Sequence, residues 1–223
     1  RKLEEILVLY LMNNDLKKRL ITSIIISLLT VFFIFQGNVI FALFITCIFF
    51  ISVFEWINLC NNKLSKFFGI NLLIVSFSLT YILRDKSLSF FIFVILISIS
   101  SDIGGFVFGK TFGGKKLTKI SPNKTYAGAF GSYILSFITS LIYLNIQTDL
   151  SVSINNDFKI IYLFLIFFIS TINQLGDLTI SYFKRIKKVS DTGNLLPGHG
   201  GLLDRIDGMI FTLPVGYIFY QFL

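Results

Sequence analysis

Charged residues are scarce in this 223-residue chain: Asp, Glu, Lys and Arg together make up 14% of it. A soluble domain of this length would carry about 25%, so the composition argues against an ordinary soluble protein. The two cysteines, Cys47 and Cys60, lack CxxC spacing, and we interpret both as small buried apolar residues without a metal or redox role. No apolar stretch precedes a small-residue cleavage site, so we expect no cleavable signal peptide.

Apolar residues are correspondingly abundant. They make up 54% of the chain, with 27 Phe and a mean hydropathy of +0.79. They occur in runs of roughly 17–25 residues, the length that crosses a bilayer as a helix. The sequence therefore predicts an all-α, polytopic integral membrane protein with about seven transmembrane helices, at Leu20–Gln36, Val39–Asn58, Phe67–Leu83, Leu88–Phe108, Tyr126–Leu144, Ile160–Tyr182 and Ile206–Leu223.

The distribution of basic residues predicts the orientation. With the N-terminus in the cytoplasm, all basic residues except Arg84, Lys86 and Lys159 fall on the cytoplasmic side, as the positive-inside rule requires. The long polar loops 109–125 and 183–205 then both face the cytoplasm from the inner membrane. We therefore attribute the net charge of +8 to basic residues that set the topology and contact anionic lipid headgroups, and we expect no nucleic-acid partner.

Two regions are predicted. Residues 1–87 hold an N-terminal amphipathic segment, 1–19, and the first three spans. Residues 88–223 form the catalytic region with its two loops. The amphipathic segment has apolar residues at helical spacing, which favours an interfacial helix; a frayed terminus is the alternative.

Four aspartates lie in or beside apolar runs: Asp102, Asp177, Asp204 and Asp207. A charge at bilayer depth costs roughly 2.5–3.5 kcal/mol, so each needs a reason to be there. Asp204 and Asp207 would share a helix face, where a divalent cation such as Mg²⁺ relieves their repulsion. Asp177 could complete the site from another helix. The alternative is that each aspartate pairs with a nearby cation such as Arg205.

Loop 109–125 combines glycines and lysines with Ser121 and Thr125, a composition suited to phosphate. The alternative is a solvated basic loop on anionic lipid. The segment 104–111 matches the P-loop pattern by letters, but it ends an apolar span, so we do not predict a P-loop. In 197–201, Pro and Gly break the helix and allow a ligand to approach. His199, the only histidine, could contact phosphate or be structural.

The segment Ser181–Asp207 resembles the signature of the phosphatidate cytidylyltransferase family, also called CDP-diglyceride synthetases. The matching positions are Ser181, Lys184, Arg185, Asp191, Gly193, Leu196, Pro197, His199, Gly200, Gly201, Asp204, Arg205 and Asp207. Ser190 departs from it, since the family usually has Lys there. Ser101–Phe106, Ser121–Thr125 and Gln174–Thr179 resemble further family motifs, and the similarity covers about residues 98–214.

The resemblance implies a reaction in which CTP and phosphatidate give CDP-diacylglycerol and pyrophosphate with Mg²⁺, for phospholipid biosynthesis. Phosphatidate would come from the inner leaflet. The resemblance leaves open whether a second, monovalent cation such as K⁺ binds and whether the chain forms a homodimer. The resemblance also implies a metal site formed by Asp102, Asp177, Asp204 and Asp207. It implies catalytic roles for Asp177, Lys184, Arg185, His199, Asp204 and Asp207. It implies substrate binding by Ser121, Pro122, Lys124, Thr125, Asp191, Gly200, Gly201 and Arg205.

Three other classes were weighed. A CDP-alcohol phosphatidyltransferase would show aspartates four residues apart, whereas Asp204 and Asp207 are three apart. A related membrane lipid or polyprenol kinase would use a similar site with another donor. A transporter of an anionic solute would need a polar path to both faces, whereas the predicted polar residues cluster on one side.

Overall fold

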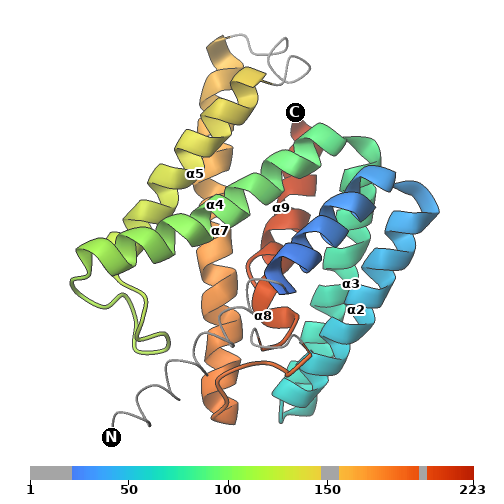
Figure 1. Cartoon of the computed structure of the whole chain (residues 1–223), viewed down its shortest axis with the longest axis vertical. Coiled ribbons are helices and arrows are strands. Elements are labelled where there is room, and N and C mark those ends of the chain that lie inside the picture. Colours follow the sequence, from blue (N-terminus) through green and yellow to red (C-terminus); the bar gives the residue numbers. More distant parts are fainter. Residues whose placement is uncertain (1–21, 147–155, 196–199) are drawn as a thin grey trace, which may run out of the picture.

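The computed structural model describes residues 22–146, 156–195 and 200–223, which are mainly helical (Figure 1). A helix Thr22–Gln36 comes first. The labelled helices are α2 (Asn38–Leu59), α3 (Lys63–Lys86), α4 (Leu88–Phe112), α5 (Tyr126–Ile146), α7 (Asn156–Lys187), α8 (Leu203–Ile206) and α9 (Met209–Phe222). The described residues contain no extended strand, and Lys116 and Thr125 form an isolated bridge. The predicted all-α class is confirmed for these residues.

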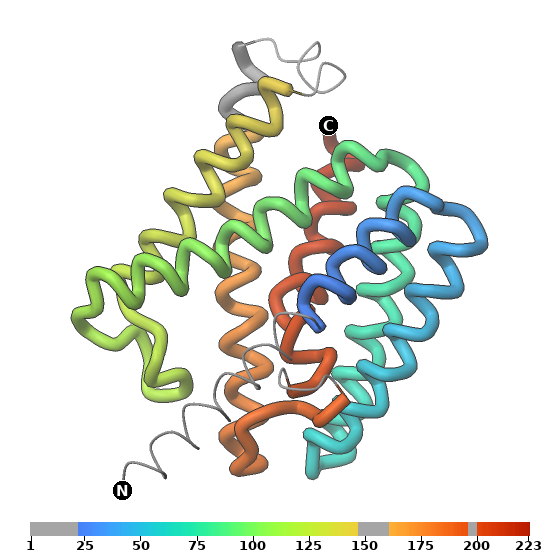
Figure 2. The backbone as a smooth tube through the Cα atoms, viewed as in Figure 1, coloured from blue at the N-terminus to red at the C-terminus, as the bar shows by residue number. Residues whose placement is uncertain are grey.

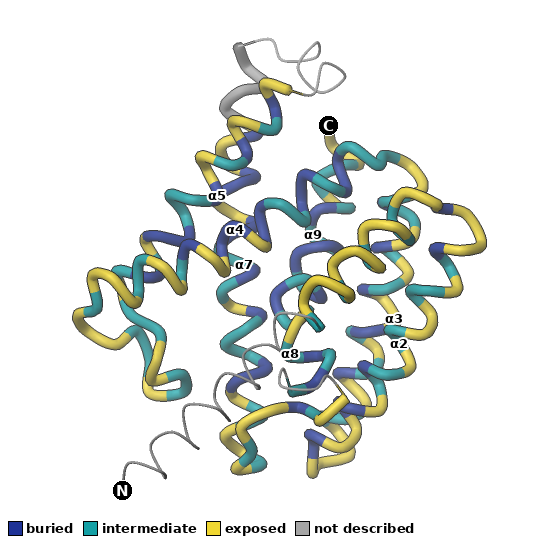
Figure 3. Tube along the Cα trace, in the orientation of Figure 1, coloured by how far each residue is buried: buried dark blue, intermediate teal, exposed yellow. Residues whose placement is uncertain are grey.

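Five helices are long and apolar enough to cross a membrane: α2, α3, α4, α5 and the Ile161–Lys187 part of α7. Large apolar side chains of α2 such as Leu43, Phe50 and Phe54 are exposed, as a helix against lipid presents them. Exposed stretches recur along α2 and α3 (Figure 3). The chain is therefore a membrane protein. The helix Thr22–Gln36 is shorter, and the predicted last span is divided into α8 and α9. The count of seven spans and the orientation of the N-terminus stay predictions.

Two short connections join neighbouring helices. Gly37, with a φ of 65°, follows the helix Thr22–Gln36. Arg84 of α3 donates from Nε and Nη2 to the Ile34 carbonyl at 2.9 and 2.7 Å, which satisfies an end group of that helix. The predicted spans Phe67–Leu83 and Leu88–Phe108 leave residues 84–87 as a connection, but Arg84, Asp85 and Lys86 continue α3, and only Ser87 separates α3 from α4. The Phe90 N–H donates to Ser87 Oγ at 3.2 Å, so Ser87 caps α4.

Both predicted polar loops are shorter than expected. Helix α4 runs to Phe112 and α7 to Lys187, so the first loop is 113–125 and the second begins at residue 188. Lys184, Arg185 and Lys187 form the last turn of α7, where positive charge stabilises the helix C-terminus. The segment 104–111 lies inside α4, so the structure confirms that it is not a P-loop. Both loops lie at the end of the molecule that also carries the α2–α3 turn (Figure 2).

The core joins all the long helices. Phe41 from α2, Leu83 from α3, Phe93 from α4, Leu165 from α7 and Leu213 from α9 belong to one buried cluster. Helix α9 lies near the centre of the molecule, between α7 and α3 (Figure 1). The division into residues 1–87 and 88–223 stays a prediction.

Helices α4 and α5 approach through small residues. A Cβ on Gly104 would lie 2.4 Å from the Gly131 carbonyl oxygen. Ser132 Oγ of α5 donates to the Ser101 carbonyl of α4 at 2.7 Å, and Ser101 Oγ lies 3.1 Å from Ser170 Oγ of α7. In a membrane the hydrophobic effect does not favour helix association, because lipid tails are as apolar as the side chains. Helices there associate through small residues and through hydrogen bonds between hydroxyl groups and neighbouring helices.

We predict that Gly104→Ala destabilises the protein by about 1–3 kcal/mol, because its methyl group would meet a backbone oxygen that cannot turn aside. Gly109→Ala in the same helix is the matched control, since its Cβ would meet nothing closer than 3.4 Å. Thermal unfolding in detergent micelles measures both. Equal melting temperatures for the two variants would contradict close α4–α5 packing at Gly104.

Candidate functional site

A cavity of about 450 Å³ lies between α4, α5, α7, the 113–125 loop and the α8 region. Most of the predicted site residues line it, although they come from separate parts of the sequence. These are Asp102, Ser121, Lys124, Thr125, Asp177, Lys184, Asp191, Asp204, Arg205 and Asp207. The four aspartates singled out from sequence therefore face one space.

Two glycines bring α7 close to the segment between α8 and α9. A Cβ on Gly208 would lie 2.1 Å from Asn173 Oδ1, and a Cβ on Gly176 would lie 3.0 Å from the Asp207 carbonyl oxygen. Each glycine is next in sequence to an aspartate of the cavity, Asp177 or Asp207. The close approach that the glycines permit is what places these two carboxylates at the same cavity.

Asp177 forms an ion pair with Lys124, which reaches it from the 113–125 loop. Ser181 Oγ, one turn later in α7, donates to Asp177 Oδ1 at 3.3 Å. Both partners of the ion pair are partly buried, so the pair ties the loop to α7. It also holds the Lys124 ammonium at the cavity wall.

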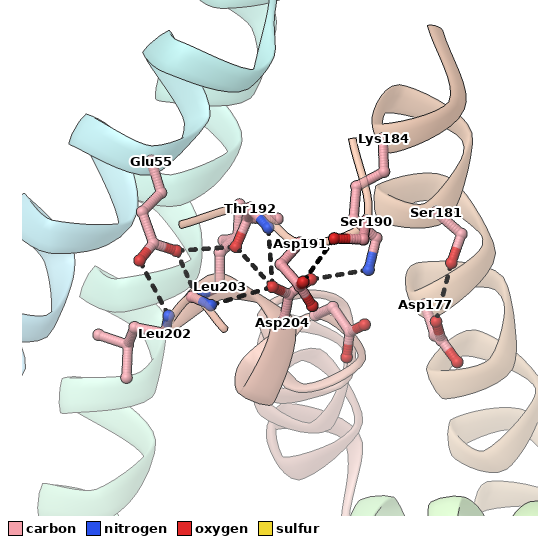
Figure 4. A network of polar contacts seen from close by, with 12 residues as sticks. Glu55, Asp177, Ser181, Lys184, Ser190, Asp191, Thr192, Leu202, Leu203 and Asp204 are labelled. Atoms are coloured by element: carbon pink, nitrogen blue, oxygen red, sulfur yellow. Dashed lines mark hydrogen bonds and ion pairs between the residues drawn. The ribbon is translucent and has the colours of Figure 1, made fainter. Parts of the chain in front are cut away.

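Asp204 accepts hydrogen bonds from four donors (Figure 4). Lys184 Nζ lies 2.7 Å from Oδ1, and the Thr192 N–H, the Thr192 hydroxyl and the Gly201 N–H lie 2.8, 3.0 and 3.1 Å from Oδ2. Burial disfavours the charged form of this carboxyl, but Lys184 and the two backbone N–H groups outweigh it and hold the pKa of Asp204 below its usual value. Asp204 is thus ionised, and it joins Lys184, Thr192 and Gly201.

Asp102 and Asp207 complete the acidic side of the cavity. Asn173 Nδ2 donates to Asp102 Oδ1 at 2.6 Å. Asp207 lies between α8 and α9 and accepts from the Gly208 N–H at 2.9 Å. The negative charges of Asp177 and Asp102 act on Asp207 and disfavour its charged form. Carboxylates that oppose each other's ionisation in this way would gain from a cation between them.

A magnesium ion fits the chemistry of these donors. In the part of the chain that the structure describes, no three His, Cys, Asp or Glu side chains converge as a ready-made cage. Mg²⁺ does not require one, because it is usually held by one or two carboxylates and takes water and substrate phosphate for the rest of its shell. Asp177 and Asp207 offer such oxygens at the cavity wall.

The 113–125 loop forms the basic wall. The Leu117 N–H donates to the Lys124 carbonyl at 2.8 Å, which folds the loop back on itself. Thr125 Oγ1 accepts from the Gly128 N–H at 3.1 Å at the start of α5. Thr125, Gly128 and Ala129 all line the cavity, so the N-terminal end of α5 faces it. A helix N-terminus attracts anions such as phosphate.

Several predicted residues lie elsewhere. Arg185 donates from Nε to the Ile120 carbonyl at 3.2 Å, and so supports the loop from outside the cavity lining. Pro122 is exposed and also absent from the lining. A Cβ on Gly200 would lie 2.8 Å from Asp191 Oδ1, so Gly200 packs against a carboxylate. Ser190 Oγ donates to the same side chain at 2.6 Å, to Oδ2. His199 lies outside the described residues.

Sequence reasoning missed Glu55. It lies in α2, and its carboxylate accepts from the Leu202 and Leu203 N–H groups and from the Thr192 hydroxyl (Figure 4). Gly201, predicted to bind substrate, packs beside it: a Cβ there would lie 2.6 Å from Glu55 Oε2. The signal was available, because Glu55 is a single acidic residue within the predicted span Val39–Asn58, and such a residue marks a functional site by default.

The model of the cytidylyltransferase family matches residues 66–223 of the chain. Phosphatidate cytidylyltransferases of Staphylococcus epidermidis and Staphylococcus aureus are each 39% identical to it over 142 residues, which is 63% of this chain and 52% of the relative. That of Bacillus subtilis is 38% identical over 137 residues, 60% of this chain and 48% of the relative. The chain thus spans about half the length of the curated relatives it matches.

We predict that Lys184→Met destabilises the protein most at neutral pH. Asp204 loses its cation, so its pKa rises relative to the wild type. A depressed carboxyl pKa stabilises the fold above the unfolded value, 3.8, and this contribution is lost as pH falls through the folded value. The gap in melting temperature between wild type and variant should therefore persist from pH 7 to about pH 4 and narrow only as the pH falls below the unfolded value of 3.8.

Lys188→Met is the control, since Lys188 is exposed one position beyond α7. A gap that does not change with pH, or an equal one in the control, would contradict the role of Lys184 at Asp204.

Proposed function

The chain belongs to the cytidylyltransferase family, and from this premise we propose that it makes CDP-diacylglycerol and pyrophosphate from CTP and phosphatidate. The observation that carries the proposal is the single cavity in which aspartates from α4, α7 and the α8 region meet Lys124, Lys184, Ser121 and Thr125. Carboxylates that suit a divalent ion and cations that suit phosphate are the combination that joining two phosphate-bearing substrates requires.

The chemistry needs positioning more than acid–base catalysis. The nucleophile is an oxygen of the phosphatidate phosphate, which is already anionic at pH 7. It attacks the α-phosphorus of CTP, a new P–O bond forms, and the bond to pyrophosphate breaks. No proton has to be removed from the nucleophile, so the site's task is to neutralise the two anions and hold them in line.

The cations of the cavity are held ready for this task. Lys124 pairs with Asp177 and Lys184 with Asp204. An entering triphosphate competes with these carboxylates for the two ammonium groups. The N-terminal end of α5 and the hydroxyls of Ser121 and Thr125 add uncharged donors.

Magnesium is part of the proposal. Asp177 and Asp207 would hold it, with Asp102 and Asp204 nearby in the same lining. When bound, the ion would withdraw charge from the phosphate oxygens that it contacts. The proposal leaves open whether a second, monovalent ion binds and whether the protein forms a dimer.

We also propose the sidedness that the basic residues predict. The cavity would face the cytoplasm at the inner membrane, CTP would enter from the water, and phosphatidate would enter from the inner leaflet. In support, the 113–125 loop and residues 188–195 lie at one end of the molecule, while the α3–α4 turn lies at the other (Figure 2). Seven spans with a cytoplasmic N-terminus would complete this arrangement.

The donor nucleotide tests the function. Purified protein in micelles that contain phosphatidate is incubated with α-labelled CTP and, separately, with γ-labelled ATP. We expect label from CTP in a lipid product that requires Mg²⁺. Transfer from ATP alone would indicate a lipid kinase, and transfer from neither would contradict the proposal. Uptake of an anionic solute into vesicles without any transfer would indicate a transporter.

We predict that Asp177→Asn and Asp207→Asn each lower kcat by about 100-fold or more while the protein stays in the membrane, because each removes a carboxylate that would hold the divalent ion at the reacting phosphates. Asp85→Asn is the control: Asp85 is exposed in the last turn of α3 and does not line the cavity. Near wild-type turnover in both cavity variants would remove the metal assignment.

A further inference from the structure

Glu55 is a buried carboxylate that the proposed chemistry does not use. It is 4% exposed and lies near the end of α2, in a part of the chain that precedes the residues matched by the family model, 66–223. A carboxylate in such a place is costly unless donors surround it. The structure shows which donors they are, and all of them belong to the segment that carries Asp204.

Both oxygens of Glu55 are engaged with the start of α8. Oε1 accepts from the Leu202 N–H at 2.9 Å, and Oε2 accepts from the Leu203 N–H at 2.8 Å. Leu202 is the N-cap residue of α8 and has no side chain able to cap it. Glu55 therefore supplies, from a distant helix, the acceptor that an N-cap side chain would normally give to free N–H groups.

The space for this carboxylate is made by two glycines. A Cβ on Gly193 would lie 2.7 Å from Glu55 Oε1, and a Cβ on Gly201 would lie 2.6 Å from Oε2. Any side chain at either position would force Glu55 out of its place. The turn between α7 and α8 is thus shaped around Glu55.

Thr192 links Glu55 to Asp204. Its Oγ1 lies 2.9 Å from Glu55 Oε2 and 3.0 Å from Asp204 Oδ2 (Figure 4). The Thr192 N–H also donates to Asp204 Oδ2, and Asp204 in turn pairs with Lys184. A continuous series of hydrogen bonds therefore runs from α2 through the turn to the cavity.

We propose that Glu55 is a positioning residue for the transfer reaction: it fixes Thr192 and the start of α8 so that Asp204, Asp207 and Lys184 hold their places at the cavity. The inference rests on the proposed function for its kinetic part. Its structural part, that Glu55 holds the turn, can be tested without any turnover.

Glu55→Gln tests the proposal because it keeps the side chain's size but replaces one acceptor oxygen with a donor NH₂ group. A donor cannot accept from the N–H groups and hydroxyl that face it. We expect kcat and kcat/KM for CTP to fall together by about 10- to 100-fold, the effect of misplaced catalytic groups. The melting temperature should fall somewhat, because the buried NH₂ group would face other donors, so kcat is measured on folded protein well below that temperature.

Thr192 provides the second arm. Thr192→Ser keeps the hydroxyl and should retain most of the activity, while Thr192→Val removes it and should lower kcat. Because Glu55 and Thr192 share a hydrogen bond, the double variant Glu55→Gln/Thr192→Val should lose less than the product of the two single losses. Ser52→Ala is the control, since Ser52 is also buried in α2 but donates only within its own helix, to Ile48.

Hydrogen exchange gives the readout that is independent of activity. Amides in peptides covering residues 201–204 should exchange faster in Glu55→Gln than in the wild type and in Ser52→Ala. If the wild type does not turn over CTP and phosphatidate, the proposed function fails, and this exchange alone decides whether Glu55 holds the turn.

Three results would overturn the inference. One is wild-type kcat in Glu55→Gln. Another is a loss of activity that only follows the loss of folded protein, which would give Glu55 a general structural role. The last is unchanged exchange at residues 201–204 in the variant.

Discussion

A carboxylate that lies among apolar helices must be given donors, because leaving its charge unpaired there costs several kcal/mol. In this protein the donors come from distant segments. Lys124 reaches Asp177 from the 113–125 loop, and Lys184 reaches Asp204 from α7. The backbone of the turn before α8 serves both Asp204 and Glu55. Satisfying these groups draws α2, α7, α8 and the loop together, and the cavity lies beside their meeting point.

The same arrangement explains why the site can be both stable and reactive. Each pairing stabilises the protein, and it also keeps a cation at the cavity wall where phosphate can reach it. Asp207 is the exception, since its strongest neighbours are the negative charges of Asp177 and Asp102. A site built in this way is stable without its ligands and gains further from a divalent ion and phosphate together.

Much of this could be predicted from the sequence. An acidic residue in an apolar run is conspicuous, and Asp102, Asp177, Asp204 and Asp207 all line one cavity. Long apolar runs located α2, α4 and α5 within a few residues of their ends. Helix ends were less predictable where charged residues were interpreted as loop. Lys and Arg have high helix propensity and are favourable at a helix C-terminus, so α3 and α7 extend through Lys86 and Lys187. Partners across space could not be predicted at all. Gly193 and Gly201 pack on Glu55, and no local pattern links residues that far apart in the chain.

The most direct test of the account is the position of the metal. Crystals of the protein with a non-hydrolysable CTP analogue and Mn²⁺ in place of Mg²⁺ would show the ion by anomalous scattering. The account predicts a peak in the cavity in direct contact with a carboxylate oxygen of Asp177 or Asp207 and an oxygen of the nucleotide phosphates, at about 2.1 Å. Bound nucleotide without such a peak, and with Asp177 and Asp204 still paired to Lys124 and Lys184, would contradict it.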